Sequence, residues 1–182
     1  TLDVEDVAFS FWRGMLIGGP STPQSLIDTA LLGVSDVTQL VDPSGALIDD
    51  RAGLIAQSAA ALQAACHTVQ QADTFNAANQ TVTFHLPQAH GPFLNILAAP
   101  WASIMDKDWL ITHGPWDGDC SRWQYAYNTL AADSPIARLE NGTGPYRLDS
   151  LIAGDEIGVT YDPEYCRQIP MWPGGPSGPA DI

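Results

Sequence analysis

Aromatic side chains are dense between residues 101 and 127. Aromatic rings line ligand clefts because they bury a large area and still offer a polar edge, but they also dominate protein cores. Trp116 and Trp123 flank a polar, glycine-containing stretch and are therefore the better candidates for a cleft. Trp109 falls on the apolar face of a predicted helix and is the better candidate for the core. The candidate ligand-binding residues are Trp101, Trp116, Asp117, Trp123 and Tyr146.

A second cluster of reactive side-chain types overlaps this aromatic stretch. Carboxylates, imidazoles and thiols are common metal ligands in proteins. The spacing here matches no known metal-binding loop, since the carboxylate ladder and terminal Glu of a calcium-binding hand are missing. Asp-Gly and Gly-Asp pairs also favour turns, because their side chains bond to nearby backbone amides. The sequence therefore predicts no metal ion and no other cofactor at the residues concerned, His113, Asp117, Asp119 and Cys120.

The serines, cysteines and histidines of the chain form no recognised catalytic motif. Nucleophilic catalysis requires a nucleophile, a base and a group that orients the base. No serine lies in a G-x-S-x-G elbow, and Cys66 falls in a predicted helix rather than in a cysteine-nucleophile motif. The sequence therefore predicts no catalytic residue. The residues considered were Ser103, Ser121, Ser134, His67, His85, His90 and His113.

The chain is strongly acidic, with 21 Asp and Glu against 7 Lys and Arg and a net charge of −14. This charge opposes binding to phosphate backbones, so the sequence predicts no nucleic-acid partner. With 45% hydrophobic and 15% charged residues, the composition is typical of a globular protein. The three cysteines permit either one disulfide with one free thiol or three buried thiols. They are Cys66, Cys120 and Cys166.

The first part of the chain is predicted to be mainly helical. Asp3 as N-cap and Asp6 three residues later indicate the start of a helix, which Gly18-Gly19-Pro20 ends. A short second helix is predicted within residues 23–32. A longer one is predicted over residues 54–71, where Ala, Leu and Gln give a high helix propensity.

Strand and helix patterns alternate in the middle of the chain. Apolar residues alternate with polar ones over residues 82–86, which predicts a strand in which Phe84 is buried. Helical spacing resumes over residues 91–112 and is interrupted at Pro100, because proline breaks a helix. Residues 116–123 are predicted to form a polar loop.

Two more strands are predicted later in the chain, over Tyr146–Leu151 and Ile157–Tyr161. A turn precedes the first of them, and we expect Gly142 or Gly144 to adopt a positive φ there. This order of helices and strands predicts an α/β fold of the α+β-like kind, in which helices flank a mixed β-sheet.

Four segments resemble, in order, the motifs of one family. Residues 3–13 resemble a Thr-Ala-Asp-Asp-Val-x-Phe-Ser-x-x-Arg helix, and residues 82–86, Val-Thr-Phe-His-Leu, resemble a VTFHL strand. Residues 141–148 resemble a GTGPYKL turn and strand, and residues 157–165 resemble the segment that follows it, with Cys166 where Trp is usual. The family that these motifs resemble is the family 5 solute-binding proteins, which include oligopeptide, dipeptide and nickel binders.

The resemblance implies a two-lobed protein of the periplasmic-binding-protein type II fold that closes on its ligand like a hinge. Residues 1–182 would then be a single fragment of lobe I, with the second lobe absent and a targeting segment, with any lipid anchor, upstream of Thr1. The location implied is extracytoplasmic, periplasmic or at the cell surface, and no enzyme activity is implied. The implied partners are a peptide-like ligand and the permease of an ABC transporter, and we expect a monomer.

Three alternatives remain open at this point. An oligosaccharide-binding protein of the same family would also stack its ligand on tryptophan. A small acidic interaction domain without a ligand and a metal-dependent hydrolase belong to other functional classes.

Ligand contacts of such a lobe are expected from connecting loops rather than from helix faces. Gly114–Tyr127 is the longest polar connection rich in aromatic residues. We expect Trp116 and Trp123 to face the cleft, and Asp117 to orient the loop or to meet a ligand donor. Both rings should be more exposed than the tryptophans of the predicted helices, Trp12 and Trp109.

Overall fold

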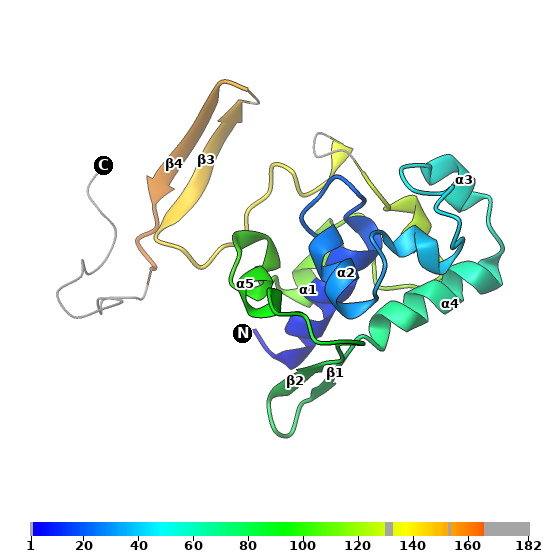
Figure 1. The fold of residues 1–182 in the computed structure, drawn as a ribbon. Helices are drawn as coiled ribbons and strands as arrows, with labels where there is room; N and C mark the ends of the chain where they lie inside the picture. The colour runs from blue at the N-terminus through cyan, green and yellow to red at the C-terminus, as the bar shows by residue number, and fades with distance from the viewer. Residues whose placement is uncertain (1, 130–132, 153, 166–182) are drawn as a thin grey trace. The chain divides into compact units, whose positions relative to one another are not determined.

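The computed structural model describes residues 2–129, 133–152 and 154–165 (Figure 1). The chain divides into two compact units, residues 1–134 and 135–182, and each is described by itself. The first unit is mainly helical, and the second contains a β-hairpin. None of the helices formed by the described residues combines the length and the hydropathy that a membrane span requires.

Helix α1 (Val4–Ile17) is the centre of the first unit. The Asp3 carboxylate accepts hydrogen bonds from the backbone N–H groups of Glu5 and Asp6, at 2.8 and 3.3 Å. The Asp6 carboxylate accepts one from the Asp3 N–H group at 2.6 Å. This capping box confirms the predicted start of the helix, because it satisfies first-turn amides and places negative charge at the positive end of the dipole. The helix contributes Ala8, Met15 and Leu16 to the core.

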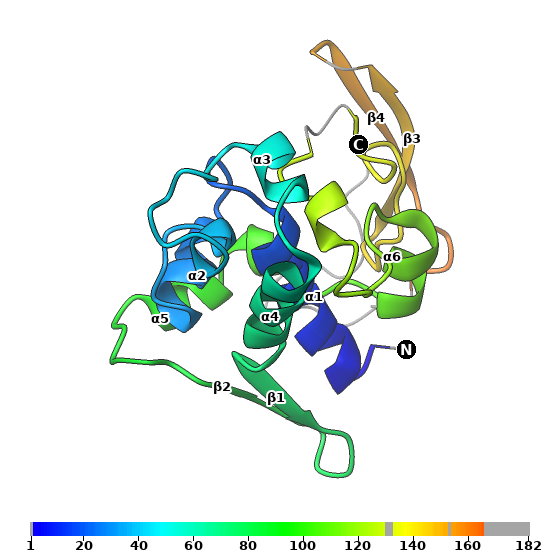
Figure 2. The ribbon, with the colours of Figure 1, turned by 90° about the vertical axis from the view of Figure 1, so that its right-hand side faces the viewer.

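Short helices pack around α1. Helices α2 (Ser25–Leu31) and α5 (Phe93–Leu97) contact each other on one side of it, and α6 (Lys107–His113) lies on the other (Figure 2). Helix α4 (Ala59–Gln70) packs against α1 as well. The 3-10 turn η2 (Pro100–Ala102) separates α5 from α6, which confirms the predicted interruption in this segment.

The segment predicted as one long helix forms two. Helix α3 (Arg51–Ile55) ends three residues before α4 begins at Ala59. Ser58 has an extended backbone, and its hydroxyl accepts a hydrogen bond from the Ala61 N–H group at 3.3 Å. A serine in this conformation caps a new helix instead of continuing the previous one. The 3-10 helices η1 (Val37–Leu40) and η3 (Trp123–Tyr125) complete the helical elements of the described first unit.

Strands β1 (Asp73–Asn76) and β2 (Thr81–Phe84) form an antiparallel hairpin in the first unit. Strand β2 confirms the predicted strand, and it shows the predicted alternation of exposed and half-buried side chains. The Phe84 ring lies edge-on to Phe11 and Phe93, with centroids 4.9 and 5.5 Å apart. Phe84 is half-buried rather than buried as predicted, because it lies in a two-stranded hairpin and not within a larger sheet.

Strands β3 (Tyr146–Ile152) and β4 (Glu156–Tyr161) form the antiparallel hairpin of the second unit, which confirms both predicted strands. The prediction of a positive φ at Gly142 or Gly144 is wrong. Both residues precede β3, whereas the tight turn lies between the strands, where Gly154 has a φ of 79°. The left-handed conformation that favours glycine is therefore used inside the hairpin.

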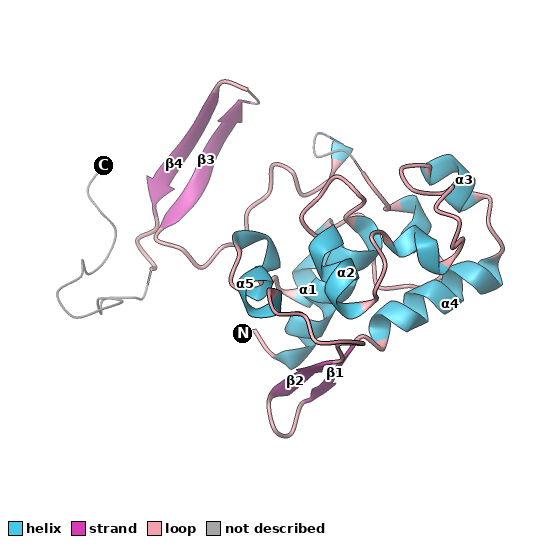
Figure 3. Ribbon diagram, viewed as in Figure 1, coloured by secondary structure: helices cyan, strands magenta, loops and turns pink. Residues whose placement is uncertain are grey.

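The combination of helices and small sheets confirms the predicted fold class (Figure 3). Within the described ranges, however, the strands form two separate two-stranded antiparallel sheets rather than one mixed sheet. Each pair consists of neighbouring segments joined by a short connection, so each hairpin forms locally. In the first unit, the helices pack mainly around α1 instead of covering a sheet.

Candidate functional site

The Gly114–Tyr127 loop is tied to α4 by a disulfide between Cys66 and Cys120, whose Cα atoms lie 5.5 Å apart. This pairing selects one disulfide from the arrangements that the sequence left open, while Cys166 lies outside the described residues. The bond joins positions 54 residues apart, so it restricts the unfolded chain and holds the loop against α4. Structural disulfides persist mainly in oxidising compartments outside the cytosol.

The two rings predicted to face a cleft are buried. Trp116 is 2% exposed and stacks on Phe9 of α1 at a centroid distance of 5.3 Å, and Trp123 is 0% exposed. The Trp123 indole N–H donates to the Leu62 carbonyl of α4 at 2.9 Å. Trp12 and Trp109 are both more exposed, so the predicted order of exposure is wrong. The reason is that the disulfide and the helices α1 and α4 draw the loop into the core of its own unit.

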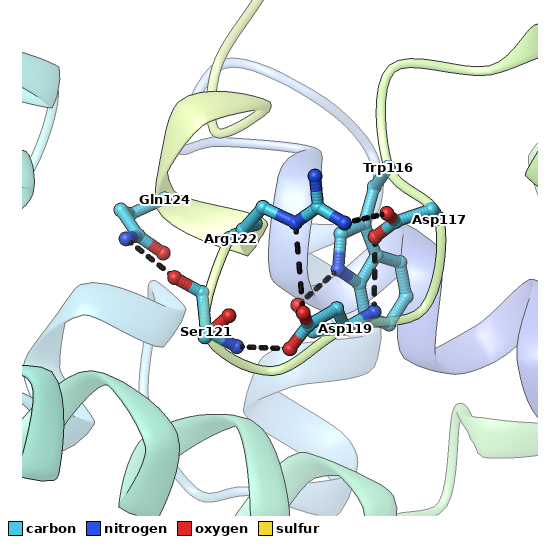
Figure 4. A network of polar contacts seen from close by, with 6 residues as sticks. All are labelled: Trp116, Asp117, Asp119, Ser121, Arg122 and Gln124. Atoms are coloured by element: carbon cyan, nitrogen blue, oxygen red, sulfur yellow. Dashed lines mark hydrogen bonds and ion pairs between the residues drawn. The ribbon is translucent and has the colours of Figure 1, made fainter.

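A network of charges holds the outer side of the loop (Figure 4). The Arg122 guanidinium lies 2.6 Å from an Asp117 oxygen and 3.5 Å from an Asp119 oxygen. The Asp119 carboxylate also accepts a hydrogen bond from the Ser121 N–H group at 2.8 Å. The hydrogen bonds from Ser121, with the nearby Arg122 cation, lower the pKa of the Asp119 carboxyl. Asp117 is therefore exposed but already paired within its own loop.

Tyr127 closes the loop from inside the core, where it is 0% exposed. Its hydroxyl donates to the Asp36 carboxylate at 3.0 Å and accepts a hydrogen bond from the Asp49 N–H group at 3.4 Å. Burial, with the neighbouring Asp36 charge, raises the pKa of the Tyr127 hydroxyl well above its ordinary value. The ring is a structural anchor of the loop, whereas Tyr125 is exposed.

The four residues with metal-ligand chemistry have other partners. Cys120 is in the disulfide, Asp117 and Asp119 pair with Arg122, and the His113 ring stacks on Trp109 at 4.9 Å. In the described part of the chain, no group of three or more His, Cys, Asp or Glu side chains is arranged to hold a metal ion.

Trp101 borders a cavity of about 80 Å³ between α1, α2 and the segment that follows α5. The ring is 41% exposed, which makes it the most accessible of the predicted tryptophans. Some polar side chains of the lining form hydrogen bonds within the protein, as Ser10 and Ser103 do, and others do not. The polar side chains that line the cavity are Ser10, Arg13, Gln24, Trp101 and Ser103.

Tyr146 begins strand β3 in the second unit and is half-buried. It lies opposite Tyr161 of β4 in the antiparallel register. Next to it, Arg147 pairs with Asp162 at 2.8 Å and with Glu164 at 3.1 Å. The ion pairs of Arg147 are thus made within the second unit.

Arg13 and Gln24 are two polar cavity residues that the sequence did not identify as site candidates. Arg13 carries one detectable signal, because it is the only Lys or Arg in the first 50 residues of an acidic chain. Its place in the helix motif is equally consistent with a structural residue of that helix, so the sequence alone does not separate the two roles. Gln24 carries no such signal, since its role depends on which segments pack against α2.

The comparisons with known proteins agree with this description. The family model of the bacterial extracellular solute-binding proteins, family 5 Middle, matches residues 1–177. No curated protein and no solved structure matches the chain. Because the family model covers nearly the whole chain, this protein belongs to the family 5 bacterial extracellular solute-binding proteins. Membership supports a substrate-binding role in an ABC importer and an extracytoplasmic location.

Proposed function

We propose that this chain is part of the substrate-binding component of an ABC importer and that its ligand is peptide-like. The observation that carries the proposal is the family match over residues 1–177. The disulfide between Cys66 and Cys120 supports an extracytoplasmic location, because such bonds form in oxidising compartments. The chain would serve as a fragment of lobe I, and a second lobe would complete the ligand site.

Capture would work by closure of the two lobes around the ligand. A ligand shifts a conformational equilibrium only by its differential affinity for the two states. A ligand that contacts both lobes in the closed state and one lobe in the open state meets this condition. The closed form is then the one that the permease of the transporter recognises.

Lobe I contacts are proposed from the accessible members of the predicted set, Trp101, Asp117 and Tyr146. Trp116 and Trp123 offer almost no surface, so their contribution is to fix the loop that carries Asp117. Trp101 gives an exposed ring beside the cationic Arg13. A peptide supplies carbonyl and carboxylate acceptors for such groups, whereas a neutral oligosaccharide supplies no charge to match the guanidinium.

The proposal is tested by thermal unfolding of the protein that contains this chain, titrated with tri- to pentapeptides and with cello-oligosaccharides. A ligand that binds the native state stabilises it by about 2.7 kcal/mol at a hundredfold excess over Kd. We expect saturable stabilisation by peptides and a weaker response in Trp101→Ala. Stabilisation by cello-oligosaccharides alone would show that the ligand is a sugar and not a peptide. Stabilisation by neither class would contradict the proposed ligand class.

A further inference from the structure

The cavity beside α1 contains a cation without a counter-charge. Arg13 is half-buried, its Nε atom is buried without a hydrogen-bond partner, and its guanidinium forms no ion pair within the described residues. Three basic residues of the described chain have acidic partners, since Lys107 pairs with Glu5 at 2.7 Å, Arg122 with Asp117 at 2.6 Å and Arg147 with Asp162 at 2.8 Å. Arg13 is thus a half-buried charge that no Asp or Glu of the described residues compensates.

The lining of the cavity offers Arg13 no acidic partner. The chain has 21 acidic side chains, yet no Asp or Glu is among the described residues that line the cavity. Burial lowers the pKa of the Arg13 guanidinium, but an arginine remains protonated in proteins. A desolvated charge is unfavourable unless a charge of opposite sign or hydrogen-bond acceptors meet it. The cavity therefore favours an anion.

Two further donors in the lining are unused. The Gln24 amide and the Trp101 indole N–H donate no hydrogen bond to any described residue. The two hydroxyls are already engaged, because Ser10 donates to the Asp6 carbonyl at 2.7 Å and Ser103 donates to the Pro100 carbonyl at 2.6 Å. The free donors of the lining are therefore the Arg13 guanidinium, the Gln24 NH2 group and the Trp101 indole N–H. An arginine fork together with an amide N–H suits the two oxygens of a carboxylate.

The cavity is large enough to hold a small organic group. About 80 Å³ is several times the roughly 10–15 Å³ of such space that one water molecule needs. The cavity therefore has room for a carboxylate with a short aliphatic stem. Trp101, at 41% exposure, offers an apolar face for whatever the carboxylate is attached to.

We propose that this cavity is a binding subsite for a carboxylate group, with Arg13 as the charged anchor and Gln24 and Trp101 as additional donors. The assignment of that carboxylate to a peptide-like solute rests on the proposed function. The affinity of the cavity for a carboxylate follows from its charge and donors alone, so the two statements are tested separately.

The first test uses sodium propionate and the neutral isostere propionamide as probes, with thermal unfolding of the protein at constant ionic strength set by sodium chloride. We expect saturable stabilisation by propionate and none by propionamide. Arg13→Gln should weaken the propionate response at least tenfold. The matched control is Arg51→Gln, because Arg51 is exposed and donates only to the Tyr125 carbonyl, and this variant should respond like the wild type. Equal responses to propionate and propionamide, or an unchanged response in Arg13→Gln, overturn the subsite.

A second variant guards against a folding defect in Arg13→Gln. Arg13→Lys keeps the charge and the apolar stem but loses the planar fork, so it should fold and bind propionate several-fold more weakly than the wild type. The contrary result would be wild-type affinity for propionate in Arg13→Lys and a loss of propionate binding in the exposed control Arg51→Gln. The net charge of the protein would then govern the response, which would overturn the assignment of Arg13.

The second test separates the subsite from the proposed function by comparing trialanine with its C-terminal amide. Tighter binding of the acid, lost in Arg13→Gln, supports both proposals. Equal binding of acid and amide, unchanged in Arg13→Gln, overturns the subsite and leaves the proposed function in place. Propionate binding through Arg13 without binding of any peptide supports the subsite and contradicts the proposed function.

Discussion

The Gly114–Tyr127 loop and the cavity beside α1 differ in whether their charged groups are paired. In the loop, Arg122 is paired with Asp117 and Asp119 on an exposed surface. In the cavity, Arg13 is half-buried and has no such partner in the described chain. The Gly114–Tyr127 loop, which is rich in aromatic rings, is therefore a structural anchor. The cavity, in contrast, keeps hydrogen-bond donors and a positive charge that no described residue pairs with. Groups that are satisfied within the protein stabilise it, and groups that are not are available to a ligand.

The largest effect should come from the buried rings of the loop. Trp123→Ala should lower the free energy of unfolding by about 3–5 kcal/mol, because it removes a fully buried ring and leaves a cavity. Trp101→Ala, at a ring that is 41% exposed, should change it by less than about 1 kcal/mol. Urea unfolding followed by circular dichroism measures both. Similar losses in the two variants would contradict the contrast between an anchored loop and an accessible cavity rim.

Removal of the disulfide should have the second largest effect. The double variant Cys66→Ser with Cys120→Ser should be less stable by about 2–4 kcal/mol, because the unfolded chain gains entropy when the cross-link is lost. Urea unfolding with and without reductant provides the measurement. Reductant should destabilise the wild type and leave the double variant unchanged. A wild type insensitive to full reduction would show that the loop is anchored by its rings alone.

An intermediate effect is expected from Asp73, a fully buried carboxyl at the face of α1 whose second oxygen has no partner in the described residues. Its other oxygen accepts from the Trp12 indole at 2.9 Å, but burial raises the pKa of Asp73 from 3.8 to about 7. The folded state then holds a proton that the unfolded state releases, so this contribution to stability is present below pH 4 and is lost as the pH rises towards 7.

Stability attributable to Asp73 should therefore fall by roughly 3 kcal/mol between pH 4 and pH 7. Asp73→Asn removes the titrating group and keeps the acceptor for Trp12, so its stability should depend less on pH over this range. Urea unfolding of both proteins at several pH values measures the difference. Parallel pH profiles of wild type and variant would show that Asp73 does not titrate in this interval.

The smallest changes in stability are expected from substitutions of Arg122 and Arg13. Loss of the Arg122 side chain should change the stability little, whereas loss of the Arg13 charge should increase it. Arg122→Ala should shift the melting temperature by less than about 2 °C, because an exposed ion pair contributes little to stability. Arg13→Met keeps the apolar stem and removes an unpaired charge, so it should raise the stability without ligand by roughly 1 kcal/mol. Differential scanning calorimetry measures both. A loss of stability in Arg13→Met would indicate that the guanidinium has a partner in the folded protein.

Local features of the fold were determined by the sequence. The capping box at Asp3 and Asp6 uses residues within one helical turn, so it is visible without any tertiary contact. The alternation in β2 is likewise local, and both predicted strands of the second hairpin are present. The break at Ser58 was missed because helix propensity favoured continuity, whereas a single extended serine starts a new helix.

The tertiary structure decided which of the candidate site residues are accessible. Trp116 and Trp123 lie in a polar stretch, yet Phe9 of α1 and the Leu62 carbonyl of α4 hold them in the core. The cavity depends in the same way on contacts between distant segments, because Arg13 and Trp101 meet only when α1 packs against the turn after α5. Burial and the lack of a partner are properties of the packed chain, so no local pattern of residues encodes them.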